Sequence, residues 1–285
     1  MLFCPAINES FLKKAINIDT DSIIFDLEDS VDVNSKKKAR ENLLNFFPKN
    51  YSGSKELIIR INNIKTSFFK EDLKLIKKLK PDTICYPKAE SPKEIKIIDK
   101  FISSYDNDHR TEIFVLIETA NGYFNASSIL NSSKRITAFA LGSEDLMSEL
   151  GINRGSLLNN PVLSHVLIDL ILLSSSMKLQ HIGPIYRGYK TKEQLKELKK
   201  ECIYLKKMNV RGKLTIHPNQ LNIINQTFDI TPQEIQEAKT KLKLFQEAER
   251  VGSSVISTNN EMEDKPSLTR VKNFLQYVKN HGFDK

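Results

Sequence analysis

Eight short apolar runs are spread over the first 216 residues, and stretches with helical periodicity separate them. The runs are Leu2–Pro5, Ser22–Phe25, Leu57–Ile61, Thr83–Tyr86, Ile113–Ile117, Ile136–Leu141, Leu179–Ile185 and Lys213–Ile216. They lack a strict alternation of apolar and polar positions, which is typical of parallel strands that helices cover. Eight such strands alternating with helices indicate an α/β fold, the (β/α)8 TIM barrel, which needs about 250 residues.

Ten segments between and after these runs are predicted to be helical. They are Glu9–Asn17, Lys36–Phe47, Lys70–Lys78, Pro92–Ser103, Asn125–Leu130, Ser143–Glu149, Pro161–Met177, Thr191–Met208, Thr231–Val251 and Ser267–Val278. The ninth has strong start signals, with Thr231 as N-cap, Pro232 as first residue and Glu234 as capping-box partner. We expect the barrel over residues 1–230. Residues 231–285 exceed what it needs, and we expect them to form a C-terminal helical, lid-like extension.

Composition and charge narrow the class of protein. Hydrophobic residues make up 40% of the 285 residues, enough for a large core, and the three cysteines form no CxxC pair. The formal net charge is +8, but lysines are dispersed over the helices without clustered arginine and interleaved aromatics, so no nucleic-acid partner is expected. No apolar stretch has the length of a membrane span, and no signal peptide is recognisable. We therefore expect a cytoplasmic protein without a membrane partner.

Most of the apolar runs are followed by charged or polar residues. The followers are Asp26–Asp29, Arg60, Asn62, Lys88, Glu90, Glu118, Glu144, Asp145 and His217. In a TIM barrel the catalytic groups lie at the C-terminal ends of the strands. The sequence therefore predicts that one end of the barrel carries the functional site.

Two of these acids follow neighbouring strands. Glu118 ends the fifth run and Asp145 follows the sixth. Adjacent parallel strands lie about 4.8 Å apart, so both carboxylates can share one cation, and oxygen ligands with room for water suit Mg²⁺. Alternatively, Asp145 caps the helix that begins there and Glu118 pairs with a lysine. Their occurrence together on adjacent strand ends favours the metal.

The basic residues at this end also allow two interpretations each. Arg60 lies inside an apolar strand, where it either binds a substrate carboxylate bidentately or forms an internal ion pair with Asp26 or Glu28. Lys88 is either a Schiff-base lysine or an ion-pair partner of Glu28 or Glu90. We favour the ion pair, because a metal makes a Schiff base unnecessary.

His217 precedes a proline after the last run and is more readily explained as a structural hydrogen-bonding residue than as a base. The two acids and the arginine together fit one chemistry. A metal chelates a 2-oxo or 2-hydroxy acid and stabilises a developing enolate, while arginine holds a carboxylate. That chemistry is metal-dependent aldol or Claisen cleavage and condensation.

Six motifs in order carry a resemblance to a known family. They are Phe25–Ser30, Ile59–Asn62, Tyr86–Glu90, Leu116–Gly122, Leu141–Leu146 and Lys213–Gln220. They resemble the citrate lyase beta-subunit-like family of the HpcH/HpaI-type aldolase superfamily, which includes malyl-CoA and citramalyl-CoA lyases. The resemblance covers nearly the whole chain and implies a TIM barrel, Mg²⁺ and a homotrimer.

The resemblance also assigns roles to residues. Glu118 and Asp145 match the family's magnesium ligands, and Arg60 matches its substrate-binding arginine, which we also count as catalytic; we expect Glu28 and Lys88 at the substrate end of the site. The segment Met262–Pro266 looks like the signature with which CoA-dependent members supply an aspartate to the adjacent subunit's site. Asp264 is therefore the candidate catalytic acid/base.

The chain departs from the family at four places, one of which is Asn259–Glu261, where a glycine is common. Pro5–Glu9 has neither the usual glycine nor the arginine, Asn159–His165 lacks an arginine, and Ile182–Pro184 lacks an aspartate. These changes leave open whether CoA, an acyl-carrier protein or neither is used. The leading hypothesis is a Mg-dependent carbon–carbon lyase or synthase acting on a small hydroxy or oxo acid or its CoA thioester. The alternatives are an aldolase on free 2-oxo acids and a catalytically weakened structural or regulatory subunit.

Overall fold

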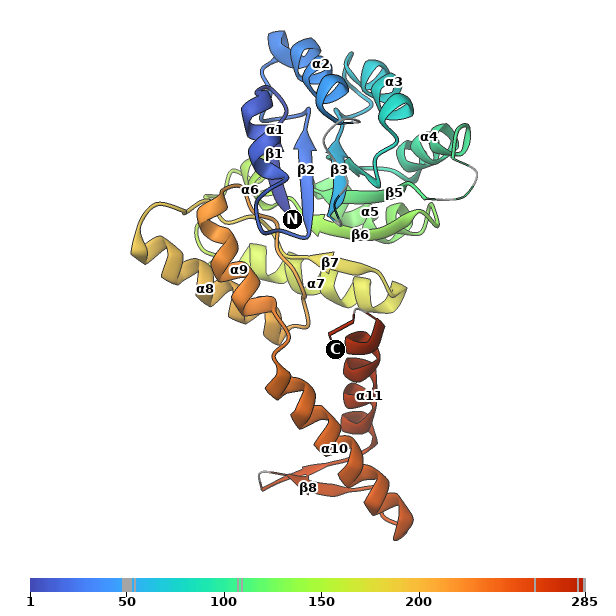
Figure 1. The fold of residues 1–285 in the computed structure, drawn as a ribbon, viewed down its shortest axis with the longest axis vertical. Helices are drawn as coiled ribbons and strands as arrows, with labels where there is room; N and C mark the ends of the chain where they lie inside the picture. The colour runs from blue at the N-terminus through green and yellow to red at the C-terminus, as the bar shows by residue number, and fades with distance from the viewer. Residues whose placement is uncertain are drawn as a thin grey trace. The chain divides into compact units, whose positions relative to one another are not determined.

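The computed structural model describes residues 1–47, 53, 55–106, 108, 110–258, 260–280 and 282–283. These residues form two compact units, Met1–Phe228 and Asp229–Lys285 (Figure 1). The boundary between them lies two residues before the one we expected. We describe each unit by itself.

The first unit is built on a seven-stranded parallel sheet, curled into a half-barrel. Its strands are β1 (Leu2–Pro5), β2 (Ser22–Asp26), β3 (Glu56–Arg60), β4 (Thr83–Tyr86), β5 (Glu112–Ile117), β6 (Ile136–Leu141) and β7 (Gln180–Ile182). Each strand pairs with the next one along the chain, and all of these pairs are parallel. All the C-terminal strand ends therefore lie at one edge of the sheet.

The eighth predicted run differs from expectation. Residues 213–215 form isolated parallel bridges, from Lys213 to Gly183 and from Thr215 to Leu2, instead of a strand. Backbone hydrogen bonds of 2.9 Å support both contacts. A physical reason lies in β7, which has only three residues, and in Pro184, two residues after its end, whose missing N–H cannot extend the ladder.

Helices connect the strands in the order that the sequence predicts. They are α1 (Glu9–Ala15), α2 (Lys36–Phe46), α3 (Phe69–Leu79), α4 (Pro92–Ser103), α5 (Ala120–Leu130), α6 (Ser143–Glu149), α7 (Pro161–Met177), α8 (Lys192–Lys207) and α9 (Leu221–Phe228), with short 3₁₀ turns η1 (Val33–Ser35) and η3 (Pro218–Gln220). Helix α5 begins five residues before its predicted start, because the Thr119 side chain caps it by accepting from the Gly122 N–H. Helix α9 has no counterpart among the predicted helices.

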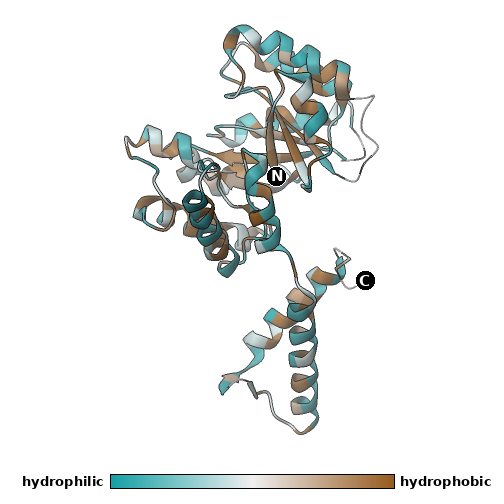
Figure 2. Ribbon diagram, turned by 60° about the vertical axis from the view of Figure 1, so that its left-hand side comes forward, coloured by the Kyte–Doolittle hydropathy of each residue, from teal (hydrophilic) through white to brown (hydrophobic). Residues whose placement is uncertain are grey.

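Buried apolar residues form two layers, one on each face of the sheet. Figure 2 shows the strands in hydrophobic colours. Phe25 and Ile59 belong to the large cluster that includes the helices, whereas Ile24 and Ile58 belong to a smaller cluster that also holds Leu214. Successive side chains of a strand point to opposite faces, so one residue in two faces the smaller cluster. The same parity applied to the strand ends places Asp26, Arg60 and Glu118 on that smaller-cluster face.

The second unit consists of two helices and a hairpin. Helix α10 (Pro232–Arg250) begins with the predicted capping box of Thr231 and Glu234, which the structure confirms. Residues 253–265 are mostly polar and contain strands β8 (Ile256–Thr258) and β9 (Glu261–Glu263), which pair antiparallel; Asn259 lies outside the described residues. Helix α11 (Lys265–Asn280) follows. In the part of the chain that the structure describes, no helix is long and apolar enough to cross a membrane.

Candidate active site

A cavity of about 270 Å³ opens at the C-terminal ends of the strands of the first unit. Its lining residues are Phe3, Pro5, Asp26, Asp29, Ser30, Arg60, Leu116, Glu118, Leu141, Gly142, Ser143, Glu144, Asp145, Ile185, Leu214 and Ile216. They include five carboxylates and one guanidinium. The cavity therefore combines an apolar floor with a strong excess of negative charge.

Arg60, at the end of β3, is clamped by carboxylates. Its Nε and Nη2 each donate to Asp26 at 2.7 Å, and its Nη1 lies 3.1 Å from Glu28 Oε2. The guanidinium also lies 4.8 Å from the Phe3 ring centre. The alternative of an internal ion pair is thus what the structure shows, and it includes both proposed partners. Arg60 nevertheless lines the cavity and is not closed off from it.

Asp26 is held by several hydrogen bonds. Besides Arg60, it accepts the backbone N–H groups of Glu28 at 2.8 Å and Ser30 at 3.1 Å. Burial alone would raise the pKa of Asp26, but the Arg60 guanidinium outweighs it and holds the pKa below its usual value. Asp26 is therefore ionised and fixes the plane of the guanidinium.

Glu118 is buried at the end of β5. Burial raises its pKa to about 8, Glu28 and Asp145 add to the rise, and Arg60 and Lys88 oppose it. Its Oε2 accepts the backbone N–H of Lys88 at 3.1 Å. The lysine that we considered as a partner thus contacts Glu118 through its main chain, while its ammonium contacts other carboxylates.

Asp145 lies in the first turn of α6, beside Glu118 on the cavity wall. The interpretation that Asp145 caps this helix is wrong, because the N-cap residue is Gly142 and no side-chain cap is formed. The Asp145 side chain is 40% exposed, and its Oδ1 lies 3.7 Å from Lys88 Nζ. Its carboxylate is therefore available to a ligand in the cavity.

Lys88 follows β4 and pairs with acids of the loop after β2. Its Nζ lies 2.6 Å from Glu28 Oε1 and 2.8 Å from Asp29 Oδ2, whereas Glu90 pairs with Lys65. Burial would lower the pKa of Lys88, but hydrogen bonds to Asp29 and Glu28 raise it. A protonated ammonium is no nucleophile, so the ion pair is favoured over a Schiff base. Neither Glu28 nor Lys88 is among the described residues that line the cavity.

His217 has the structural role that we favoured. Its Nδ1 accepts the Asn219 N–H at 3.1 Å, which caps the 3₁₀ turn η3. Its ring stacks on Tyr189 with 4.0 Å between ring centres. These contacts hold together the loops after β7 and after residues 213–215.

Sequence reasoning missed Arg154, a buried residue between α6 and α7. Its Nε lies 3.1 Å from Ser143 Oγ and 3.2 Å from Glu144 Oε1, and its Nη2 donates to the Ile185 carbonyl at 2.6 Å. It also contacts the buried Glu201. Arg154 therefore ties the start of α6, which carries Asp145, to the end of β7. The available signal was a lone arginine between glycines in a lysine-rich chain.

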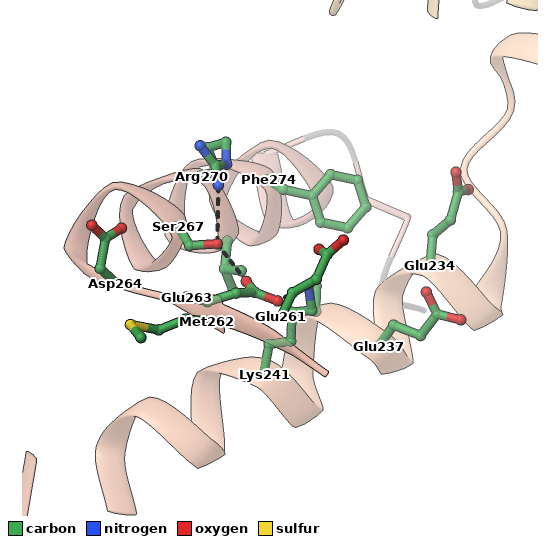
Figure 3. A pocket seen from close by; sticks show the side chains of 12 residues that line it. Glu234, Glu237, Lys241, Glu261, Met262, Glu263, Asp264, Ser267, Arg270 and Phe274 are labelled. Carbon is green, nitrogen blue, oxygen red and sulfur yellow. Dashed lines mark hydrogen bonds and ion pairs between the residues drawn. The ribbon is translucent and has the colours of Figure 1, made fainter. Parts of the chain in front are cut away.

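Asp264 belongs to the second unit. It is exposed, directly precedes α11 and lines a cavity of about 480 Å³ formed by that unit's own residues (Figure 3). Glu263 lines the same cavity, and hydrogen bonds from Lys241, Ser267 and Thr258 lower its pKa to about 2. The structure thus brings Glu118, Asp145 and Arg60 together in one unit and assigns Asp264 to the other.

The donor set of the first cavity fits a hard divalent cation. Among the described residues, no group of three or more histidine, cysteine or carboxylate side chains is placed to hold a metal ion by itself. Glu118 and Asp145 nevertheless line the same cavity, and burial raises the pKa of Glu118 to about 8, so that a cation beside it would favour its ionised form. Mg²⁺ takes one or two carboxylates and completes its shell with water or substrate oxygens. The residues present therefore suit this ion.

Comparison with known proteins identifies the family of this chain. A model of the HpcH/HpaI aldolase/citrate lyase family matches residues 1–218. The chain is 28% identical to citrate lyase subunit beta of Leuconostoc mesenteroides subsp. cremoris, over 100% of this chain and 94% of the relative. It is 29% identical to a (3S)-malyl-CoA thioesterase of Cereibacter sphaeroides, over 96% and 92%.

A solved structure shares the fold. CitE of Mycobacterium tuberculosis, crystallised with magnesium, acetoacetate and coenzyme A, superposes with a TM-score of 0.78 at 23% identity, over 96% of each chain. The resemblance seen in the six strand-end motifs is therefore confirmed. The chain belongs to the HpcH/HpaI aldolase/citrate lyase family of enzymes.

Proposed function

We propose that this protein is a Mg²⁺-dependent carbon–carbon lyase or synthase of the aldol or Claisen type, similar to citrate lyase beta subunits. Its substrate is a small hydroxy or oxo acid or the CoA thioester of such an acid. The observation that carries the proposal is the placement of Glu118, Asp145 and Arg60 around one cavity at the strand ends. Two oxygen ligands and a carboxylate-binding cation are what this chemistry requires.

Glu118 and Asp145 are the proposed ligands of Mg²⁺. When bound, the ion supplies Lewis-acid stabilisation of negative charge on a carbonyl oxygen. The magnesium found in the structure of M. tuberculosis CitE supports this choice. Arg154 helps to position the proposed ligand Asp145, because it contacts Ser143 and Glu144 at the start of the helix that carries Asp145.

Arg60 is the proposed substrate-binding and catalytic cation. Asp26 holds its Nε and Nη2, so Nη1, which now faces Glu28, is the edge that a substrate carboxylate can share. Glu28 and Lys88 are proposed as further substrate-binding residues. Glu28 links the two cations, since one of its oxygens faces Arg60 and the other faces Lys88.

Asp264 is the proposed general acid/base. We propose that the protein is a homotrimer in which the second unit of one copy brings Asp264 to the cavity of its neighbour. The exposed position of Asp264 before α11 and its place in a separate compact unit support this role. A carboxylate delivered by a mobile unit can move a proton once closure excludes water.

Two finer expectations remain part of the proposal. The bridges from Lys213 to Gly183 and from Thr215 to Leu2 support closure of the seven-stranded sheet into a TIM barrel, with residues 213–215 in the place of an eighth strand. We also propose a cytoplasmic location, with neither a membrane nor a nucleic acid as a partner.

A second activity is favoured by one comparison. The (3S)-malyl-CoA thioesterase relative points to hydrolysis of a hydroxyacyl thioester at the same site. An aldolase on free 2-oxo acids is the third candidate. The set of Glu118, Asp145, Arg60 and Asp264 argues against a weakened structural or regulatory subunit, which has no need for all four.

One assay separates these activities. The purified protein is incubated with Mg²⁺, acetyl-CoA and glyoxylate, and the mixture is analysed for malyl-CoA, free CoA thiol and remaining glyoxylate. A lyase or synthase forms the C4 thioester, and a thioesterase releases thiol from added malyl-CoA without releasing glyoxylate. An aldolase on free acids cleaves free hydroxy-oxo acids without CoA.

The matched control is Glu118→Gln, which is expected to abolish metal-dependent turnover while preserving the fold. Titration of Mg²⁺ by calorimetry completes the test. Full activity in Glu118→Gln or after chelation, or no magnesium binding by the unchanged protein, contradicts the proposed function.

A further inference from the structure

Lys88 contacts the carboxylates on both sides of the proposed metal site. Its ammonium lies 2.6 Å from Glu28, 2.8 Å from Asp29 and 3.7 Å from Asp145. Its backbone N–H donates to Glu118 at 3.1 Å. One residue thus joins the two proposed metal ligands to the acidic loop after β2.

The backbone of Lys88 is built for this double contact. Its φ is +49°, in the left-handed region that residues other than glycine seldom adopt. Lys80 and Lys178 also have positive φ, but both are C-caps of helices, where this conformation is common. Asn63 holds the turn by donating to the carbonyls of Pro87 and Lys88 at 3.0 and 3.1 Å.

The three contacts of the ammonium are unequal. Glu28 and Asp29 lie within hydrogen-bond distance, and the Glu28 side chain is 8% exposed. Asp145 is farther away, and its side chain is 40% exposed. The ammonium is therefore anchored on the loop after β2 and only loosely associated with Asp145.

We propose that Lys88 is a displaceable counter-ion of the metal site. While the site holds no divalent ion, the ammonium neutralises Asp145. When an ion binds, Asp145 contacts the ion instead, and the ammonium stays paired with Glu28 and Asp29. This inference rests on the proposed function, since it assumes that Glu118 and Asp145 bind a divalent cation. According to this inference, the positive charge of Lys88 lowers the affinity of the site for the divalent ion, in addition to any effect on substrate binding.

Electrostatics decides the direction of the effect. Two like charges separated by a few ångströms in a partly buried site repel strongly, so the ammonium opposes a divalent ion on Asp145. Without an ion, the same ammonium relieves repulsion among Glu28, Asp29 and Asp145. Removal of the positive charge should therefore tighten metal binding and destabilise the metal-free protein at the same time.

The test compares Lys88→Met with Lys65→Met in the full-length protein. Lys65 pairs with Glu90, is 62% exposed and does not line the cavity, so it is a matched control. Mn²⁺ and Mg²⁺ affinities are measured without substrate, by electron paramagnetic resonance and calorimetry, and metal-free thermal unfolding is followed by circular dichroism. For Lys88→Met, the Kd should fall by about tenfold or more and the metal-free Tm should decrease. Lys65→Met should change neither.

Two further variants keep the inference open to refutation. Lys88→Arg retains the charge and should retain a Kd close to that of the unchanged protein. Lys88→Gln should tighten metal binding as Lys88→Met does, and it replaces the methionine variant if that variant does not fold.

An unchanged or weaker affinity in a folded, uncharged variant overturns the inference, because it means that Lys88 only orients the site or binds substrate. A protein that binds no divalent ion before mutation contradicts the proposed function itself. The two failures are therefore distinguishable.

Discussion

Gly142 lies against the Glu118 carboxylate so closely that a side chain at this position would overlap it. A Cβ at Gly142 would be 2.2 Å from Glu118 Cγ and 2.4 Å from Oε1. Gly142 is also the N-cap residue of α6, which carries Asp145 three residues later. The missing side chain therefore allows a carboxylate from β5 to share the cavity wall with one from α6.

Gly142→Ala is the first prediction. The added methyl group would overlap Cγ, Cδ and Oε1 of Glu118, so the Glu118 side chain must leave its present position for the variant to fold. We expect an intact fold and a loss of Mg²⁺ affinity of about tenfold or more, measured by calorimetry. Gly212→Ala is the control for steric overlap, since a Cβ there meets only Ile182 Cδ1, at an ordinary contact distance of 3.8 Å. Unchanged metal affinity in Gly142→Ala would show that Glu118 is no ligand.

Arg60→Lys is the second prediction. Lysine keeps the positive charge but cannot reproduce the fork that Asp26 holds through Nε and Nη2. We expect kcat/KM to fall by about a hundredfold, measured with the substrate that the assay identifies. Arg40→Lys is the control, because Arg40 contacts Asp72 by Nη1 alone and lies outside the cavity lining. Equal losses in the two variants would point to a general effect on folding.

The third prediction concerns His181, a buried residue of β7. Both of its ring nitrogens lack a hydrogen-bond partner among the described residues, and burial lowers its pKa from 6.5 to about 4. Between pH 6.5 and 4, His181 therefore binds a proton in the unfolded chain but stays neutral in the folded protein. Stability from this group is fully present above pH 6.5 and is lost as the pH falls through this interval, by about 3 kcal/mol at 1.4 kcal/mol per pKa unit.

Replacement of His181 by leucine should flatten the acid limb of the stability curve. Urea unfolding between pH 7 and 4.5 measures the free energy of unfolding for the unchanged protein and the variant. His165→Gln is the control, because the His165 side chain is 73% exposed. An acid limb of the same slope in His181→Leu would assign the loss of stability to other groups.

The fourth prediction tests the shared site. Neither Asp264→Asn nor Arg60→Ala should be active alone, but mixed oligomers of the two chains should recover part of the activity. Recovery is expected because a mixed oligomer contains cavities with intact Arg60 that receive an intact Asp264 from the neighbour. Native mass spectrometry verifies mixing, and each variant mixed with itself is the control. No recovery in verified mixed oligomers, or a monomer at working concentration, would contradict the trimer.

Truncation after Gly252 removes the β8–β9 hairpin and α11 of the second unit and leaves α10 in place. Residues 253–285 belong entirely to the second unit, so metal binding and the fold of the first unit should remain. Turnover should be lost with Asp264. A truncated chain that keeps full turnover would exclude Asp264 as the acid/base.

The sequence alone was sufficient to predict the strands and the edge of the sheet that carries the site. Seven of the eight apolar runs contain strands, because continuous burial of a parallel strand leaves an apolar run that needs no knowledge of its neighbours. Glu118, Asp145 and Arg60 were found from the same pattern, since a charge at the end of a buried strand is costly unless it binds a partner or a ligand. Their common cavity follows from parallel order, in which all C-terminal strand ends meet at one edge.

Tertiary structure decided which charges pair and where the pattern ends. The sequence allowed Lys88 to pair with Glu28 or Glu90, and only folded distances select Glu28, 60 positions away in the chain. The sequence likewise allowed Arg60 either to bind a substrate carboxylate or to form an internal ion pair, whereas the structure shows Asp26 bound to two of its nitrogens. The contacts of Arg154 and the reduction of the eighth strand to bridges did not follow from the local apolar pattern. Ion pairs, bridges and steric gaps such as Gly142 depend on distances between segments far apart in the chain, which local apolar patterns do not encode.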